Sequence, residues 1–142
     1  MKNEIGLTKS KFPPLLSLTY VLQQSADELL AREVGTSLSH VRIMSGLGSA
    51  IARSQHELAL ELQQTEANIS RQLQVMKKQG LVGITKNKKD GRQRDVKLTR
   101  KGQNKFDSAN KLLKKQQSSF LKVLNQGEAE ILNFAAQKIS KT

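Results

Sequence analysis

Residues 65–78 carry side chains that match the hydrogen-bonding edges of DNA bases. At about 100° per residue, the helical face opposite the apolar Ile69 points outward. The outward face carries Ala67, Arg71, Gln74 and Lys78, and Asn68 and Ser70 lie on its flanks. Thr65 begins the segment. Arginine can donate two hydrogen bonds to guanine, Asn or Gln can pair with adenine, an alanine methyl can approach thymine, and Ser and Lys suit phosphates. An ordinary amphipathic helix has the same outline, so this face alone leaves both interpretations open.

A second polar segment, residues 86–93, lies between two short apolar runs. Residues 81–85 are β-branched and apolar, and residues 95–99 alternate around Val96 and Leu98, which together predict a two-stranded hairpin. The tip and its flanks carry the charged residues Lys88, Lys89, Asp90, Arg92 and Arg94. A basic hairpin directly after a polar helix favours contact with a phosphate backbone over a merely solvated hairpin tip.

The basic charge of the chain is concentrated around these two segments. The formal net charge is +12, and residues 71–115 hold 15 of the 24 Lys and Arg but 3 of the 12 Asp and Glu. A charge that served only solubility would be spread more evenly. The distribution therefore favours a nucleic-acid partner over the alternative of a solvated basic surface.

Two helices are predicted before the polar segments. Apolar residues recur at helical spacing from Leu15 to Leu29 behind Pro13-Pro14, and Gly35 ends this first helix. Ser37 or Ser39 caps a second helix. Its apolar side carries Val41, Met44 and Leu47.

The next two helices have the pattern of a helix-turn-helix. Residues 54–57, with Ser54 and Glu57 at their ends, form a capping-box sequence that begins a third helix of about ten residues. Its buried side is expected to carry Leu58, Ala59 and Leu62. Thr65 is placed to cap the fourth helix, which ends at Gly80. The motif needs a small residue where the helices meet and a buried aliphatic on the second helix, and Ala59 and Ile69 occupy these positions.

A long helix is predicted from Thr99 to about Leu124, followed by a turn at 125–127 and a last helix. The apolar residues of that last helix are Ile131, Leu132, Ala135 and Ile139. The apolar stripes of the first helix and of the last two exceed what one small lobe can cover. The sequence therefore predicts a homodimer assembled from these helices.

Several other classes of protein are disfavoured. The sequence contains no cysteine, which excludes disulfides and thiolate zinc sites, and its 4% of aromatic residues is too low for a base-stacking platform. The histidines, His40 and His56, lie on separate predicted helices without a carboxylate cluster, so we expect no enzyme activity, cofactor or metal. Residues 1–11 lack an apolar run, and no stretch approaches the roughly 18 apolar residues of a membrane span. We expect a cytoplasmic protein.

At this point the sequence resembles the MarR family of winged helix-turn-helix regulators over nearly its full length. The strongest stretch is 58–102, and the ordered motifs there and just before it are Glu57-Leu58-Ala59, Ile69-Ser70-Arg71, Gly80-Leu81-Val82, Asp90-Gly91-Arg92 and Val96-Lys97-Leu98-Thr99-Arg100-Lys101-Gly102. The resemblance implies a mainly α fold with a small β-hairpin wing. It divides a single unit, 1–142, into a DNA-binding lobe at 37–99 and a helical dimerisation region at 12–35 and 100–142.

The resemblance also implies roles for individual residues. Asp90 would order the wing, and Arg92 would enter the minor groove, where a narrow A·T-rich groove attracts cations. The first helix and the last two would interlock two subunits. A small aromatic or phenolic effector would bind between the dimerisation and DNA-binding parts. The function implied is that of a ligand-responsive repressor, which binds a pseudo-palindromic operator on double-stranded DNA as a homodimer.

The sequence departs from the family at four positions. Gln63 stands where glycine is usual, Gln64 and Gln72 replace apolar residues, and Gly91 stands where the wing is often basic. An unusual turn and an unusual seat for the fourth helix are expected. The alternatives to a sequence-specific regulator are a winged-helix adaptor for protein contacts and a nonspecific nucleic-acid-binding protein.

Overall fold

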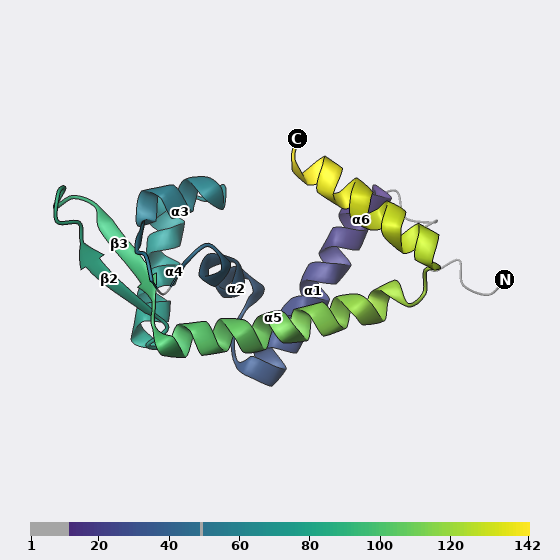
Figure 1. The fold of residues 1–142 in the computed structure, drawn as a ribbon, viewed down its shortest axis with the longest axis horizontal. Helices are drawn as coiled ribbons and strands as arrows, with labels where there is room; N and C mark the ends of the chain where they lie inside the picture. The colour runs from purple at the N-terminus through teal and green to yellow at the C-terminus, as the bar shows by residue number, and fades with distance from the viewer. Residues whose placement is uncertain (1–11, 49) are drawn as a thin grey trace.

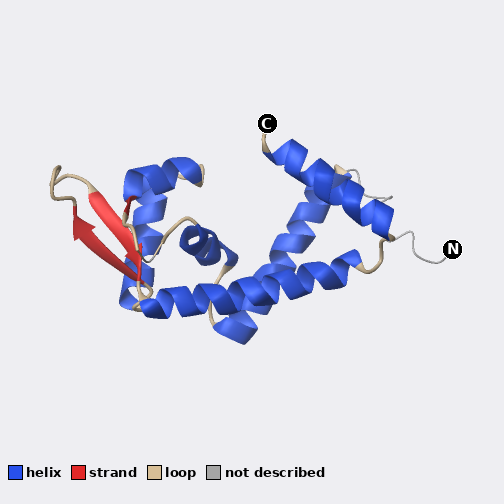
Figure 2. Ribbon diagram, in the orientation of Figure 1, coloured by secondary structure: helices blue, strands red, loops and turns tan. Residues whose placement is uncertain are grey.

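The computed structural model describes residues 12–48 and 50–142, so the expectation for residues 1–11 lies outside the described residues. The described part forms helices and one small sheet (Figure 2). In chain order the elements are α1 (Pro14–Val34), α2 (Leu38–Ser45), β1 (Arg53–Ser54), α3 (Gln55–Glu61), α4 (Glu66–Lys78), β2 (Val82–Lys86), β3 (Arg94–Leu98), α5 (Arg100–Leu121) and α6 (Gln126–Ser140). The expected mainly α fold with a β wing is confirmed.

The elements are arranged as a lobe and an elongated helical part (Figure 1). Helices α2, α3 and α4 gather with the sheet at one end, and α5 runs from the sheet toward the other end, where α6 lies. Helix α1 packs against α5 and α2. Over the residues described, none of the helices has both the length and the apolar character of a membrane span.

The sheet has three antiparallel strands in the order β1-β3-β2. The expected two-stranded hairpin is therefore incomplete, and its strands are shifted by one residue, to 82–86 and 94–98. The missed strand, β1, has two residues that pair with Val96 and Asp95. A strand of two residues is too short to show the alternation of apolar and polar residues that identifies a strand in a sequence. Its partner strand also comes from a distant part of the chain, so no local turn signal accompanies it.

Local capping explains where most helices begin. The side chains of Ser37, Ser54, Thr65 and Asn125 each accept a backbone N–H from the first turn of their helix, and Gly35 ends α1 at φ 63°. Ser37 and not Ser39 caps α2. The remaining differences are at the ends of the helices.

Helix α3 has seven residues, ending at Glu61, and is shorter than expected. The long helix α5 ends at Leu121 instead of near Leu124. The expected turn at 125–127 is wrong beyond its first residue, because Asn125 forms a capping box with Glu128 and α6 begins at Gln126. Gly127 therefore lies inside the helix.

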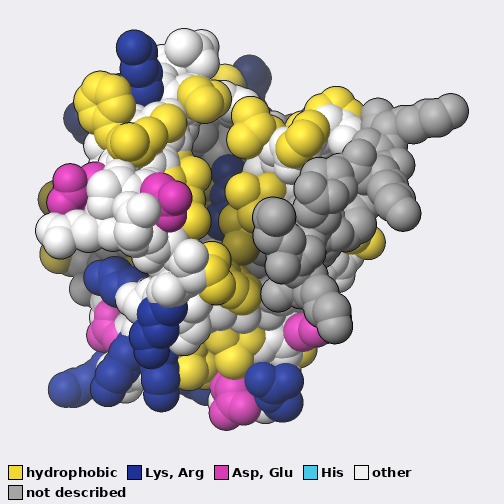
Figure 3. All heavy atoms as spheres, turned by 90° about the vertical axis from the view of Figure 1, so that its right-hand side faces the viewer, with side chains coloured by type: hydrophobic (Ala, Val, Ile, Leu, Met, Phe, Trp, Pro, Cys, Tyr) yellow, Lys and Arg dark blue, Asp and Glu magenta, His cyan; other side chains and the backbone are white. Residues whose placement is uncertain are grey.

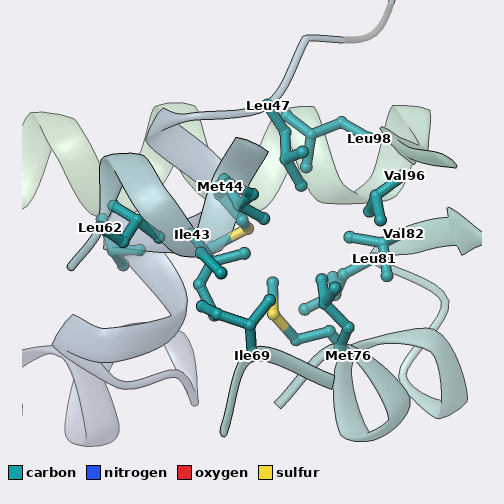
Figure 4. Packing of buried hydrophobic residues seen from close by; sticks show 14 of the residues in the cluster. Ile43, Met44, Leu47, Leu62, Ile69, Met76, Leu81, Val82, Val96 and Leu98 are labelled. Atoms are coloured by element: carbon teal, nitrogen blue, oxygen red, sulfur yellow. The ribbon is translucent and has the colours of Figure 1, made fainter. Parts of the chain in front are cut away.

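One apolar core holds the lobe together and fixes the position of α4. Figure 4 shows side chains of α2, α4 and the sheet pointing toward one another. Its buried members are Leu30, Val41, Ile43, Met44, Leu47, Leu58, Ala59, Leu62, Ile69, Leu73, Met76, Leu81, Val82, Val96, Leu98 and Ala109. The expected inner faces of α2, α3 and α4 are confirmed. Burying a side chain such as Leu73 stabilises the fold by about 1.5–3 kcal/mol, so rotating α4 out of this register is unfavourable.

The other end of the molecule exposes apolar side chains on α1 and α6. None of the residues of α6 is buried. Figure 3, which looks onto this end, shows apolar side chains spread over the face. We call this the exposed apolar surface, and its large residues are Leu15, Leu16, Tyr20, Val21, Ile131, Phe134 and Ile139.

Candidate nucleic-acid interface

The turn between α3 and α4 is tight and contains an unusual backbone conformation. Gln63 adopts φ 53°, in the left-handed region that glycine occupies most easily. The N–H of Gln64 donates to the carbonyl of Ala59 at 3.0 Å, which closes the turn. The expected unusual turn at Gln63 is thus a glycine-like conformation made by a residue with a side chain.

Helix α4 presents the expected polar face to solvent. Ile69, Leu73 and Met76 are buried against the core. On the opposite side the exposed residues are Ala67, Arg71, Gln74 and Lys78. Asn68 and Ser70, on the flanks, are half-buried, and Thr65 caps the helix by accepting the N–H of Asn68 at 3.2 Å. The structure therefore brings all seven expected residues to the surface of one helix.

A hydrogen-bonded chain of side chains joins α4 to its neighbours. The hydroxyl of Ser39 donates to Oε1 of Gln72 at 2.5 Å, and Nε2 of Gln72 donates to Oε1 of Gln64 at 3.0 Å. The same oxygen accepts Nδ2 of Asn68 at 2.7 Å. Sequence reasoning flagged Gln64 and Gln72 as atypical but missed that they bond to each other and to an expected base-contacting residue.

The first turns of α3 and α4 are also joined by a contact between two side chains. Nδ1 of His56, in the first turn of α3, pairs with Oε1 of Glu66, in the first turn of α4. His56 was expected only as part of the capping segment. This contact was missed because the two side chains meet only when the turn folds.

The wing tip is ordered by short-range hydrogen bonds to Asn87 and Asp90. Oδ1 of Asn87 accepts the backbone N–H groups of Lys89 and Asp90 at 2.8 and 3.0 Å. Oδ1 of Asp90 accepts the N–H of Arg92 at 3.0 Å. Asn87 was missed by sequence reasoning, although an Asn two residues before a polar turn is a signal for this kind of side-chain to backbone bond.

The basic side chains of the wing differ in their exposure and in their hydrogen bonding. Lys88, Lys89 and Arg92 are exposed. Arg94 is half-buried, and its Nη1 donates to the carbonyl of Gly91 at 3.1 Å, so that its guanidinium lies back along the tip. Arg94 was expected near a phosphate, and the structure adds a bond that stabilises the turn.

The wing and the first turns of α3 and α4 border one depression of about 290 Å³. Its lining residues are Gln55, His56, Glu66, Arg92, Gln93 and Arg94, drawn from α3, α4 and the wing. The first turns of two helices and two arginine residues therefore border the same space. Such an arrangement attracts anions, although Glu66 offsets part of the positive charge.

The comparison with protein families identifies the lobe. The sequence model of the winged helix DNA-binding domain matches residues 40–116, which is more than half of the chain. The chain belongs to the winged helix DNA-binding domain family. No curated protein gives a significant sequence match.

Solved structures extend the likeness of this winged helix protein beyond its lobe. The alignment with a crystal structure of MarR covers 93% of this chain and 92% of the MarR chain, with a TM-score of 0.82 and 16% sequence identity. The transcriptional repressor CouR, bound to a 23-mer DNA duplex, covers 99% of both chains with a TM-score of 0.82 and 19% identity. The alignment with the crystal structure of the S. aureus MepR-DNA complex covers 89% of this chain and 93% of the MepR chain, with a TM-score of 0.76 and 17% sequence identity. The MarR-type fold expected from the sequence is confirmed.

One titratable group in this winged helix lobe has a shifted pKa. Burial disfavours the charged imidazolium of His40 and lowers its pKa from the ordinary value of 6.5. His40 lies in α2, next to Ser39, and its backbone N–H is bonded to Ser37. The described residues contain no group of three His, Cys, Asp or Glu that could hold a metal ion.

Proposed function

We propose that this protein is a sequence-specific, double-stranded DNA-binding transcription regulator that acts as a homodimer on a pseudo-palindromic operator. The observation that carries the proposal is the depression bordered by the first turns of α3 and α4 and by the wing residues Arg92 and Arg94. This supports an arrangement in which the polar face of α4 and the basic hairpin lie on the same side of the lobe. DNA can then contact both at once.

The two parts would read DNA in different grooves. Helix α4 has the exposed side chains and the diameter to enter the major groove, with Arg71, Gln74 and Asn68 near base edges and Ser70 and Lys78 near phosphates. The ordered wing would carry Arg92 into the adjacent minor groove. Lys88 and Lys89 would then lie over the phosphate backbone.

Homodimerisation is supported by the exposed apolar surface of α1 and α6. Ile131 and Phe134 are 70% and 67% exposed on a helix without buried residues, and Leu15 of α1 is 64% exposed. Contiguous exposed apolar patches mark surfaces that bind a partner, such as protein–protein interfaces. A second copy would cover it and would set two α4 helices about one turn of DNA apart.

Repression and control by a small aromatic or phenolic ligand complete the proposal, as the resemblance to the MarR family implies. CouR is named a transcriptional repressor, which supports the first part by analogy of fold. Such a regulator would act on DNA in the cytoplasm and would not be an enzyme. A thermal-shift screen of phenolic acids, followed by DNA release assays, tests the ligand part.

The function is tested by selecting bound sequences from random duplex DNA with the full chain. We expect an inverted repeat with half-sites about 10 base pairs apart, bound much more tightly than scrambled DNA. Binding should weaken steeply with salt and should be lost on RNA duplexes of the same sequence. Equal binding to all duplexes would make the protein a nonspecific binder, and no binding would favour a protein-interaction adaptor.

A further inference from the structure

The hydrogen-bonded chain described above crosses three segments of the lobe. It begins at Ser39 near the start of α2, passes through Gln72 in the middle of α4, and reaches Gln64 in the turn before α4. It ends at Asn68, on the flank of the recognition face. All four side chains are half-buried, so unmade hydrogen bonds within the chain would be costly. We call these four residues the amide chain.

We propose that Ser39, Gln72 and Gln64 are positioning residues that hold the side-chain amide of Asn68 in the orientation that recognises adenine. The inference rests on the proposed function, because it assigns a task to a residue of the DNA-contacting helix. None of the three needs to touch DNA. They act on Asn68 indirectly, because each hydrogen bond sets which side of the next side-chain amide, oxygen or nitrogen, faces its partner.

The hydrogen bonds of the amide chain converge on one acceptor, Oε1 of Gln64. The Ser39 hydroxyl donates to the oxygen of Gln72, so the nitrogen of that amide faces Gln64. The oxygen of Gln64 receives both this nitrogen and the nitrogen of Asn68. Gln64 therefore acts as a double acceptor, and it selects the Nδ2 side of Asn68.

The bond to Gln64 leaves Asn68 with the groups that adenine needs. An Asn amide has two N–H donors and one oxygen acceptor, and Gln64 uses one of the N–H groups. The second N–H and Oδ1 stay outside the amide chain. Adenine offers an acceptor at N7 and a donor at N6 in the major groove, which match these two groups. If every amide were reversed, Oδ1 would face Gln64, and the N6 donor of adenine would lose its partner.

The chain also orders Asn68 before DNA arrives. A solvent-exposed Asn loses side-chain freedom when it binds a base, and a side chain already held in place loses less. The bond from Ser39 connects the amide chain to α2. The same hydrogen bonds therefore hold α4 against α2 and orient the side-chain amide of Asn68. Apolar residues at 64 and 72 would pack in the same places without selecting an orientation.

The test uses an operator selected with the wild-type protein. Each adenine of one half-site is replaced in turn by 7-deazaadenine, which lacks the N7 acceptor but keeps N6. We expect one position where this weakens wild-type binding about fivefold or more, the lower end of what a bidentate contact contributes. Asn68→Ala should abolish the effect at that position and leave the other positions unchanged.

Gln64→Leu and Ser39→Ala should also remove most of the 7-deazaadenine effect, although neither changes a residue in contact with the base. Ser39→Thr retains a hydroxyl and should restore it. Gln79→Leu is the matched control, because Gln79 is exposed at the end of α4 and should keep the full effect. Combined with Asn68→Ala, Gln64→Leu should cause no further loss of adenine discrimination.

The outcomes separate this inference from the proposed function. If the wild type selects an operator and Gln64→Leu and Ser39→Ala keep the full 7-deazaadenine effect, the positioning role is overturned. It is also overturned if Asn68→Ala leaves every adenine position as sensitive as before. Failure of the wild type to bind any duplex specifically would instead overturn the proposed function. Thermal unfolding is measured for each variant, and if Gln64→Leu does not fold, the Ser39→Ala and Ser39→Thr pair decides.

Discussion

The carboxylate of Asp90 accepts the backbone N–H of Arg92 at 3.0 Å, across the tip of the wing. Together with the two N–H groups bonded to Asn87, this bond orders the tip through hydrogen bonds within the wing itself. The backbone that carries the Arg92 guanidinium is therefore ordered before DNA binds.

The first prediction concerns Arg92→Ala. Because a narrow minor groove concentrates negative potential, the loss of the guanidinium should weaken binding most on operators with A·T-rich flanks. Asp90→Ala should have part of the same effect, by loosening the tip. Fluorescence anisotropy titrations on operators with A·T-rich and G·C-rich flanks measure both.

Lys88→Ala provides the contrast for Arg92→Ala. It should lower the salt slope of binding by about one for each phosphate that the ammonium group no longer neutralises, with little change in flank preference. A weakening by Arg92→Ala that is the same on both flanks would make the wing a nonspecific electrostatic arm.

The second prediction concerns Arg71, which is exposed in the middle of the outer face of α4. If it pairs with guanine, Arg71→Ala should cost about 1–3 kcal/mol on the preferred operator and relax the base preference at one position of each half-site. Competition titrations with operator variants measure this. An equal loss on specific and random DNA would assign Arg71 to a phosphate.

The third prediction concerns the exposed apolar surface. Deleting residues 116–142 should abolish the homodimer, and Ile131→Glu should weaken it strongly, because a charge would be buried in the interface. Gln137→Glu changes the charge equally on the polar side of α6 and should leave the dimer intact. Sedimentation velocity over a range of concentrations measures the association. A truncated chain that remains dimeric and binds DNA with full affinity would contradict the assignment.

The fourth prediction concerns the junction of the sheet and α5. A Cβ on Gly102 would lie 2.0 Å from the carbonyl oxygen of Leu81, so α5 packs against this backbone at a distance that only glycine allows. Gly102→Ala should destabilise the fold by about 1–3 kcal/mol or more, since backbone must move. Gly83→Ala, with nothing within 4 Å of its Cβ, is the control and should be nearly neutral. Urea unfolding of both variants decides, and equal stability would contradict this packing.

The fifth prediction concerns pH. Burial lowers the pKa of His40, so the unfolded chain binds this proton at a higher pH than the native protein does. The stability that His40 contributes is fully present above pH 6.5 and is lost as the pH falls through its native pKa. His40→Gln should therefore reduce the decline in unfolding free energy between pH 7.5 and 5.5, measured by urea denaturation. An unchanged decline would show that His40 is not the group responsible.

The sequence by itself determined the features that depend on neighbouring residues. Ser54, Thr65 and Gly35 mark helix ends because a cap bonds to a backbone group within one turn, and the 3.6-residue period placed Ile69, Leu73 and Met76 on the buried face. The wing followed from two short runs around a polar tip. These signals were sufficient for the helices, for the hairpin and for the polar face of α4, but not for strand β1.

Only the tertiary structure decided how those residues are held. Strand β1 exists because Arg53 meets Val96, 43 positions further along the chain, and is anchored by bonds from its guanidinium to Gly46 and Glu61. Ser39 reaches Gln72 across 33 positions, and His56 reaches Glu66 only after the turn at Gln63 has closed. A side-chain hydrogen bond depends on a separation of about 3 Å and on its direction, and neither leaves a periodic trace in the sequence. The identities of Gln64 and Gln72 were visible as exceptions, but their function as partners arose only when α2, the turn and α4 packed together.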